Sequence, residues 1–145
     1  MQVTTDDDAD LGARQTLKLC LAGDVMCGRG IDQIMGHPGD PAIYEPWAKS
    51  AASYVDLAER RSGPIPRAVA PDYVWGDVLT DLREAAPDAF VVNLETAVTD
   101  RGSPWPGKGI QYRMHPANVD CLTAAGVDVA VLANNHVLDL SLIHI

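Results

Sequence analysis

The chain has 145 residues, of which 47% are hydrophobic and 21% charged, and its formal net charge is -9 at pH 7. This composition predicts one globular domain with an apolar core, since a domain commonly needs about 100–200 residues. The acidic balance argues against a nucleic-acid partner, which requires a basic face, and is compatible with a cation site. No apolar stretch reaches the roughly 18 residues that a membrane span needs.

The two ends of the chain differ from its centre. Residues 1–14 are acidic and polar, which predicts a disordered tail. They carry acids where a signal peptide has positive charge followed by an apolar stretch, so the sequence as written predicts a cytoplasmic protein. Residues 140–145 read LSLIHI, which matches the translation of a sequencing-adapter end, and we interpret them as non-native. We expect residues 15–139 to be the N-terminal part of a longer domain.

Four elements are predicted in the first half of the chain. The apolar run 17–22 predicts a β-strand, and a glycine-rich turn at 26–30 follows it. Apolar side chains then recur at three- and four-residue spacing up to residue 61, which predicts a helix whose first turn contains Pro46. A second helix is predicted to begin near Asp72.

The second half completes an alternating pattern. The run 89–92 predicts a second strand, and the Gly- and Pro-rich segment 100–109 predicts an irregular loop near the functional site. A third helix is predicted to begin at Pro116 and to end at the capping Gly126, before a third strand at 127–133. Strands that alternate with helices are typical of right-handed crossover units, so the sequence predicts an α/β fold with a parallel sheet.

The three cysteines include no CxxC pair, which indicates neither a disulfide framework nor a zinc knuckle. Cys20 lies in the first predicted strand and Cys121 in the third predicted helix, so both are expected to be buried. Cys27 lies in the glycine-rich turn, three residues after Asp24, and differs from the other two in that it could line the site.

Polar residues follow each predicted strand. Asp24 follows the first strand, Asn93 and Glu95 the second, and residues 134–136, Asn-Asn-His, the third. The carboxyl ends of parallel strands meet at one edge of the sheet, where ligands bind. Each residue alone fits a turn, a cap or a packed side chain. Together they predict a hydrolytic metal site, because carboxylate and amide oxygens ligate cations and an imidazole acts as general acid or base.

The same residues belong to a set of short motifs. In chain order these read LAGDVM at 21–26, GRG at 28–30, VNLET at 92–96, PGKG at 106–109, YRMHP at 112–116, AAGVD at 124–128 and LANNHVLD at 132–139. The set resembles the capsule-synthesis CapA family, which is associated with poly-γ-glutamate and belongs to the calcineurin-like metallophosphoesterase superfamily. The resemblance implies a partial metallophosphoesterase-like α/β domain, a truncated β-sandwich flanked by helices.

The resemblance also implies roles for individual residues. Asp24, Glu95 and Asn135 fall where the superfamily has metal ligands, and the implied cofactors are divalent ions, with Mn, Zn, Fe or Mg as candidates. His136 falls where the superfamily has the residue that protonates a leaving group or steadies the transition state. Asp139 would orient that imidazole, so His136 and Asp139 are the predicted catalytic pair.

The chain departs from the superfamily pattern at Met26, which stands in place of a histidine ligand, as in other CapA proteins. The remaining histidine ligands of the superfamily come later in the sequence than any residue here, so the resemblance implies an incomplete site. The predicted function is metal-dependent hydrolysis in capsule synthesis, with capsule-synthesis components or poly-γ-glutamate as partners and association with the cell envelope. A soluble phosphoesterase unrelated to capsules, and a non-catalytic scaffold or polymer-binding component, are the alternatives.

Basic and amide side chains near these motifs suggest how an anionic substrate would bind. Arg29 and Arg113 can each clamp a phosphate or carboxylate, and Asn93, near Glu95, is the third predicted substrate-binding residue. The alternative is that both arginines pair with acids of this acidic chain. Lys108, which lies between glycines, could also approach an anion.

Overall fold

The structure is a computed structural model that describes residues 16–140. The tail predicted at 1–14 and residues 141–145 lie outside the described residues, whereas Leu140, the first residue of the hexapeptide, is buried. In chain order the strands are β1 (Leu19–Val25), β2 (Ala89–Leu94), β3 (Ala97–Val98), β4 (Arg113–Met114) and β5 (Val129–Val131), and the α-helices are α1 (Arg29–Asp32), α2 (Ala52–Ser62), α3 (Val78–Ala85) and α4 (Asp120–Ala124).

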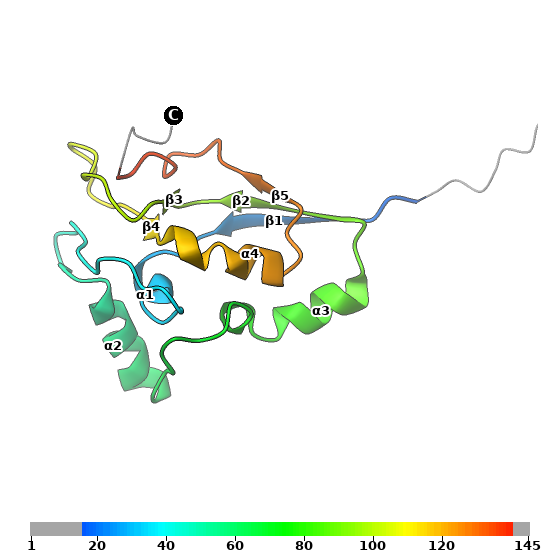
Figure 1. Ribbon diagram of the computed structural model, residues 1–145, viewed down its shortest axis with the longest axis horizontal. Coiled ribbons are helices and arrows are strands. Elements are labelled where there is room, and N and C mark those ends of the chain that lie inside the picture. Colours follow the sequence, from blue (N-terminus) through cyan, green and yellow to red (C-terminus); the bar gives the residue numbers. More distant parts are fainter. Residues whose placement is uncertain (1–15, 141–145) are drawn as a thin grey trace, which may run out of the picture.

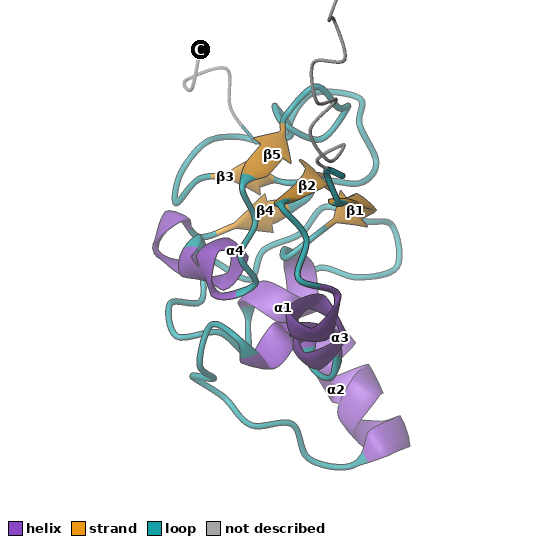
Figure 2. Ribbon diagram, turned by 90° about the vertical axis from the view of Figure 1, so that its right-hand side faces the viewer, coloured by secondary structure: helices purple, strands orange, loops and turns teal. Residues whose placement is uncertain are grey.

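The central feature is a three-stranded parallel sheet in the order β1-β2-β5, and β3 and β4 form a second, two-stranded parallel sheet. The helices lie on one side of the larger sheet (Figures 1 and 2). This arrangement confirms the predicted α/β class and the three predicted strands. None of the helices among residues 16–140 is long and apolar enough to cross a membrane.

The core lies between the sheet and the helices. Along β2 every second side chain is buried, so that Phe90, Val92 and Leu94 face the helices. A half-buried Trp75 joins two parts of this layer, because its ring meets Phe90 edge-on at 6.2 Å and its indole N–H donates to the Cys121 carbonyl at 2.7 Å. Burial of apolar surface in this layer is what holds the helices against the sheet.

The opposite face of the sheet is apolar and open. The register pairs Leu19 with Ala89 and Val91 with both Leu21 and Val129, so these side chains share one face. Leu21 is 72% exposed and Val129 is 49% exposed. A parallel sheet normally has both faces covered. The part of the chain that the structure describes therefore has the uncovered face expected of a partial domain.

Two predicted helices begin later than the apolar spacing indicates. Residues before α2 form a bridged loop, in which the Ala51 N–H donates to the Pro41 carbonyl at 2.7 Å, so α2 begins at Ala52 rather than near Pro46. The segment predicted to be helical from Asp72 first makes a short 3-10 helix over Tyr73–Trp75, and Gly76, at φ 54°, separates this turn from α3. A positive φ cannot be accommodated within an α-helix.

The third predicted helix is also divided, into a 3-10 helix over Pro116–Asn118 and then α4. Its predicted ends are confirmed. His115 is the N-cap, and its ring nitrogen accepts a hydrogen bond from Ala117 N. Gly126 follows the helix with φ 72°, a conformation that glycine adopts without strain.

The structure confirms the predicted burial of Cys121 and differs from the predictions for the other two cysteines. Cys121 is fully buried and Cys20 is half-buried. Cys27 does not line the site, because it is 5% exposed and belongs to the same core cluster as Cys121. A hydrogen bond with Cys121, together with burial, raises the pKa of the Cys27 thiol far above its usual range.

Candidate functional site

One extra residue in β1 decides where Asp24 points. The strands pair Leu21 with Val91, but Asp24, three positions later, pairs with Asn93, only two positions later. Side chains alternate between the faces of a strand, so Val91 and Asn93 share a face and the bulge brings Asp24 to it. Without the extra residue Asp24 would pair with Leu94, whose side chain faces the helices.

Asn93 connects the two carboxylates at the ends of β1 and β2. Its side-chain Nδ2 donates to Asp24 Oδ1 at 2.8 Å and to Glu95 Oε2 at 2.7 Å. A chain of hydrogen bonds that begins at the backbone fixes the orientation of the Asn93 amide. The first bond is donated by the His136 N–H to Asn134 Oδ1 at 2.9 Å. Asn134 Nδ2 must then donate to Asn93 Oδ1, also at 2.9 Å, which leaves Asn93 Nδ2 for the carboxylates.

The two carboxyl groups differ in acidity because they lie side by side. Hydrogen bonds with Asn93 and then with Glu95 lower the pKa of Asp24. The hydrogen bond with Asp24, followed by burial, raises the pKa of Glu95. Two adjacent carboxylates repel when both are ionised, so a proton on one stabilises the charge on the other. Glu95 is therefore the more readily protonated member of the pair.

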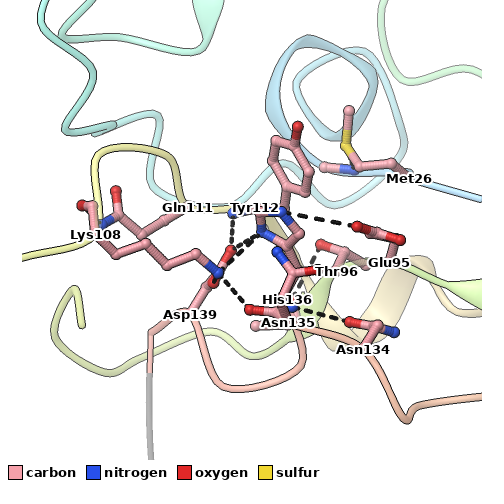
Figure 3. A network of polar contacts seen from close by, with 12 residues as sticks. Met26, Glu95, Thr96, Lys108, Gln111, Tyr112, Asn134, Asn135, His136 and Asp139 are labelled. Carbon is pink, nitrogen blue, oxygen red and sulfur yellow. Dashed lines mark hydrogen bonds and ion pairs between the residues drawn. The ribbon is translucent and has the colours of Figure 1, made fainter. Parts of the chain in front are cut away.

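The imidazole of His136 stands beside this pair and is held from three directions (Figure 3). Its Nδ1 lies 2.5 Å from Asp139 Oδ2, and its Nε2 lies 3.8 Å from Glu95 Oε1. The ring of Tyr112 stacks on it, with centroids 4.0 Å apart and planes 22° apart. The Tyr112 N–H also donates to Asp139 Oδ2 at 2.6 Å. His136 and Asp139 are both buried, so the ring has little freedom to turn.

The loop between β3 and β4 reaches this site, as predicted for the segment 100–109. Lys108 Nζ donates to Asp139 Oδ1 and to the Asn135 carbonyl, and it lies 3.3 Å from His136 Nδ1. The Trp105 N–H donates to the Asp139 carbonyl at 2.9 Å. The anion that Lys108 contacts is therefore the Asp139 carboxylate of the chain itself, and its approach to a substrate anion stays a prediction.

Of the two neighbouring amides, the structure turns Asn134 and not Asn135 toward the carboxylates. Asn135 is exposed, and it meets the cluster through its backbone carbonyl, which accepts from Lys108. Its side chain lines an open groove of about 510 Å³ together with Trp105 and Leu138. The sequence offered no signal that distinguishes the two asparagines, since both are short polar residues that follow a strand.

The sequence predicts that the two arginines either bind substrate or pair with acids of the chain, and the structure shows both of them paired with acids. Arg29 lies 2.5 Å from Glu45 Oε1, and its guanidinium covers the rings of Tyr54 and Tyr112 at 5.0 and 4.8 Å. Arg113 donates to the Asp40 carbonyl and lies 3.7 Å from its carboxylate. Neither guanidinium supports a substrate-binding role by its position.

The donor atoms fit a divalent cation in part. Asp24 and Glu95 offer oxygens on one side of the site, and His136 Nε2 points toward Glu95. Among residues 16–140, however, no group of three or more His, Cys, Asp or Glu side chains is arranged to hold a metal ion. Met26, for which the resemblance implies a histidine in related proteins, turns its sulfur to the Gly28 N–H at 3.2 Å. A cation at Asp24 and Glu95 would need further ligands.

Most of this chain is similar in sequence to known proteins. The family described as bacterial capsule synthesis protein PGA_cap matches residues 18–142, a range that includes the first three residues of the hexapeptide. Two proteins named probable polyglutamine synthesis accessory protein, from strains CDC 1551 and H37Rv of Mycobacterium tuberculosis, are each 46% identical over 128 residues. This alignment covers 88% of the chain and 34% of each relative, so the chain spans about a third of their length. No solved structure matches it. The chain belongs to the bacterial capsule synthesis protein PGA_cap family.

Proposed function

We propose that the full-length protein takes part in the synthesis or export of a poly-γ-glutamate capsule as a metal-dependent hydrolase. Family membership supports the capsule role, and the names of the two relatives, which refer to polyglutamine synthesis, support a role with such a polymer. One observation supports the hydrolytic role, namely the convergence of Asp24, Glu95 and His136 from three separate strand ends. A buried His-Asp pair beside two carboxylates is costly to build for packing alone.

Each residue of the cluster has a distinct part in this proposal. Asp24 and Glu95 would hold a divalent cation, with Mn, Zn, Fe or Mg the candidate ions. Asn135, the further ligand that the resemblance implies, would have to turn its side chain from the groove toward them to take part. When bound, the cation would supply positive charge that stabilises the transition state of phosphoester or related bond cleavage. His136 would accept a proton at Nε2 and release it there, and Asn93 would keep the two carboxylates in place.

The test separates proton transfer from metal binding in the full-length protein. His136→Ala is expected to lower turnover of a generic phosphodiester by about 10²–10⁴-fold while metal content is retained, which is the usual scale for loss of a general acid or base. Asp24→Ala is expected to lose metal, because it deletes an anionic ligand. Asp56→Ala, an exposed aspartate on α2, is the matched control and should change neither quantity. Metal is measured by elemental analysis across Mn, Zn, Fe and Mg.

A second candidate function is a non-catalytic, polymer-binding role. The absence of a three-residue acid, histidine or cysteine group among residues 16–140 favours it, as does Met26 at a ligand position. An intact protein that binds poly-γ-glutamate, but contains no metal and hydrolyses nothing, would support this role and contradict the hydrolytic one. Isothermal titration calorimetry with the purified polymer gives the binding measurement.

A further inference from the structure

Lys108 is the positive partner of a buried carboxylate. The side chain of Asp139 has no exposed surface, and the side chain of Lys108 is 24% exposed at the rim of the groove. The ammonium group meets Asp139 Oδ1 and the Asn135 carbonyl, which lie on the same turn after β5 (Figure 3). A buried carboxylate without such a partner is strongly unfavourable, so Lys108 fixes both the charge balance and the orientation of Asp139.

The distances around His136 select one tautomer of its ring. Nδ1 lies 2.5 Å from Asp139 Oδ2 but 3.3 Å from Lys108 Nζ. A proton on Nδ1 gives a short, charge-assisted hydrogen bond to the carboxylate. In the other tautomer the Nδ1 lone pair would face Asp139 Oδ2 at the same short distance, which is repulsive. The proton therefore belongs on Nδ1, and Nε2 faces Glu95 as an acceptor.

We infer that Lys108 is a positioning residue that holds His136 in the Nδ1–H tautomer by acting through Asp139. Lys108 occupies Oδ1, which leaves Oδ2 for His136 Nδ1 and for the Tyr112 N–H. Without the ammonium group the carboxylate would lose its contact at Oδ1, so its plane could turn and Oδ2 would no longer be held opposite His136 Nδ1. The inference rests on the proposed function for the consequence that Nε2 is the reacting nitrogen.

The first measurement reads the tautomer without substrate. In the full-length protein with ¹⁵N-labelled histidine, at mildly alkaline pH, the ring nitrogen shifts of His136 should report the Nδ1–H form, and His136→Gln assigns the signal. Lys108→Met should introduce the Nε2–H form, and Lys108→Arg, which keeps the charge, should restore the original pattern. Lys18→Met is the matched control, since Lys18 also caps a carbonyl, that of Ala85 at 2.6 Å.

The second measurement separates positioning from substrate binding. Lys108→Met should lower kcat by about 10–100-fold with KM within about twofold, as for other residues that orient a reacting group. A raised KM with unchanged kcat would show that Lys108 binds substrate and would overturn the inference. An unchanged tautomer in Lys108→Met would overturn it as well. If that variant does not fold, Lys108→Gln gives the same reading.

The two proposals fail in different ways. A wild-type protein that hydrolyses nothing would refute the proposed hydrolysis, while the tautomer measurement would still decide the role of Lys108. A protein that hydrolyses the phosphodiester, but whose His136 tautomer does not depend on Lys108, would keep the proposed function and refute this inference.

Discussion

Asn134 and Asn93 are joined side chain to side chain, with Asn134 Nδ2 donating to Asn93 Oδ1 at 2.9 Å across 41 residues of sequence. Asn134 Nδ2 also donates to the Leu94 carbonyl at 2.9 Å. One amide thereby ties the loop after β5 to the end of β2 and, through Asn93, to the two carboxylates. The geometry of Asp24 and Glu95 depends on this link.

Asn134→Asp should therefore destabilise the protein. The aspartate cannot donate, so Asn93 Oδ1 and the Leu94 carbonyl each lose a partner, and a third negative charge enters the acidic pair. We expect the free energy of unfolding to fall by roughly 1–3 kcal/mol, the usual cost of unsatisfied buried polar groups. Chemical denaturation of the full-length protein gives this value.

Asn135→Asp is the control for that change, because it alters the neighbouring residue in the same way at an exposed position. Its effect on stability should stay within about 0.5 kcal/mol, as for other surface substitutions. Equal losses in the two variants would show that the loop as a whole, and not the Asn134 amide, is sensitive to charge.

Tyr112 should act on His136 through its ring and not through its hydroxyl. Tyr112→Phe keeps the stacked face at 4.0 Å and is expected to leave turnover within about twofold, because ring stacking contributes about 0.5–1.5 kcal/mol and is retained. Tyr112→Ala removes that face and should lower turnover by about tenfold or more. Steady-state hydrolysis of a phosphodiester checks both variants, and a large loss in Tyr112→Phe would contradict the expectation.

The open face of the sheet should make the 145-residue chain self-associate or behave as a molten state when it is produced alone. Leu21→Lys places a charge on this face and should shift the sedimentation profile toward monomer. Leu57→Lys, on α2, replaces a leucine that is 56% exposed but lies away from the sheet, and should have little effect. A sharp cooperative melt of a monomeric wild-type chain, with dispersed amide resonances, would contradict this prediction.

The three thiols should react in two groups. Cys20 is half-buried, whereas Cys27 and Cys121 are buried and the pKa of Cys27 is raised, which lowers its thiolate fraction at neutral pH. We expect a maleimide to label one thiol per chain in the native full-length protein, apart from any cysteines outside this chain, and all three after denaturation. Mass spectrometry of peptides identifies the labelled residue, and Cys20→Ser should abolish the native label.

The local sequence pattern by itself determined the strands, the shared polar cluster at their ends and the positions of one loop and one helix cap. Apolar runs predicted the three parallel strands because a strand buried in an α/β sheet reads as a short continuous apolar segment. The polar residues at the strand ends predicted one shared cluster, because parallel strands bring their carboxyl ends to one edge. Glycine and proline marked the loop at 100–109 and the cap at Gly126, since their backbone preferences act within a few residues.

Tertiary structure decided the details on which the chemistry depends. The bulge in β1 turns Asp24 to the face of Asn93. This register shift of one residue is set by the pairing of β1 with β2, and no local sequence pattern encodes that pairing. Asn134 rather than Asn135 contacts Asn93, which lies 41 positions away in the sequence. Lys108 contacts Asp139, which lies 31 positions away. Such contacts form only when packing has fixed the loops, because hydrogen-bond geometry is specific to a few tenths of an ångström while sequence pattern specifies only the element.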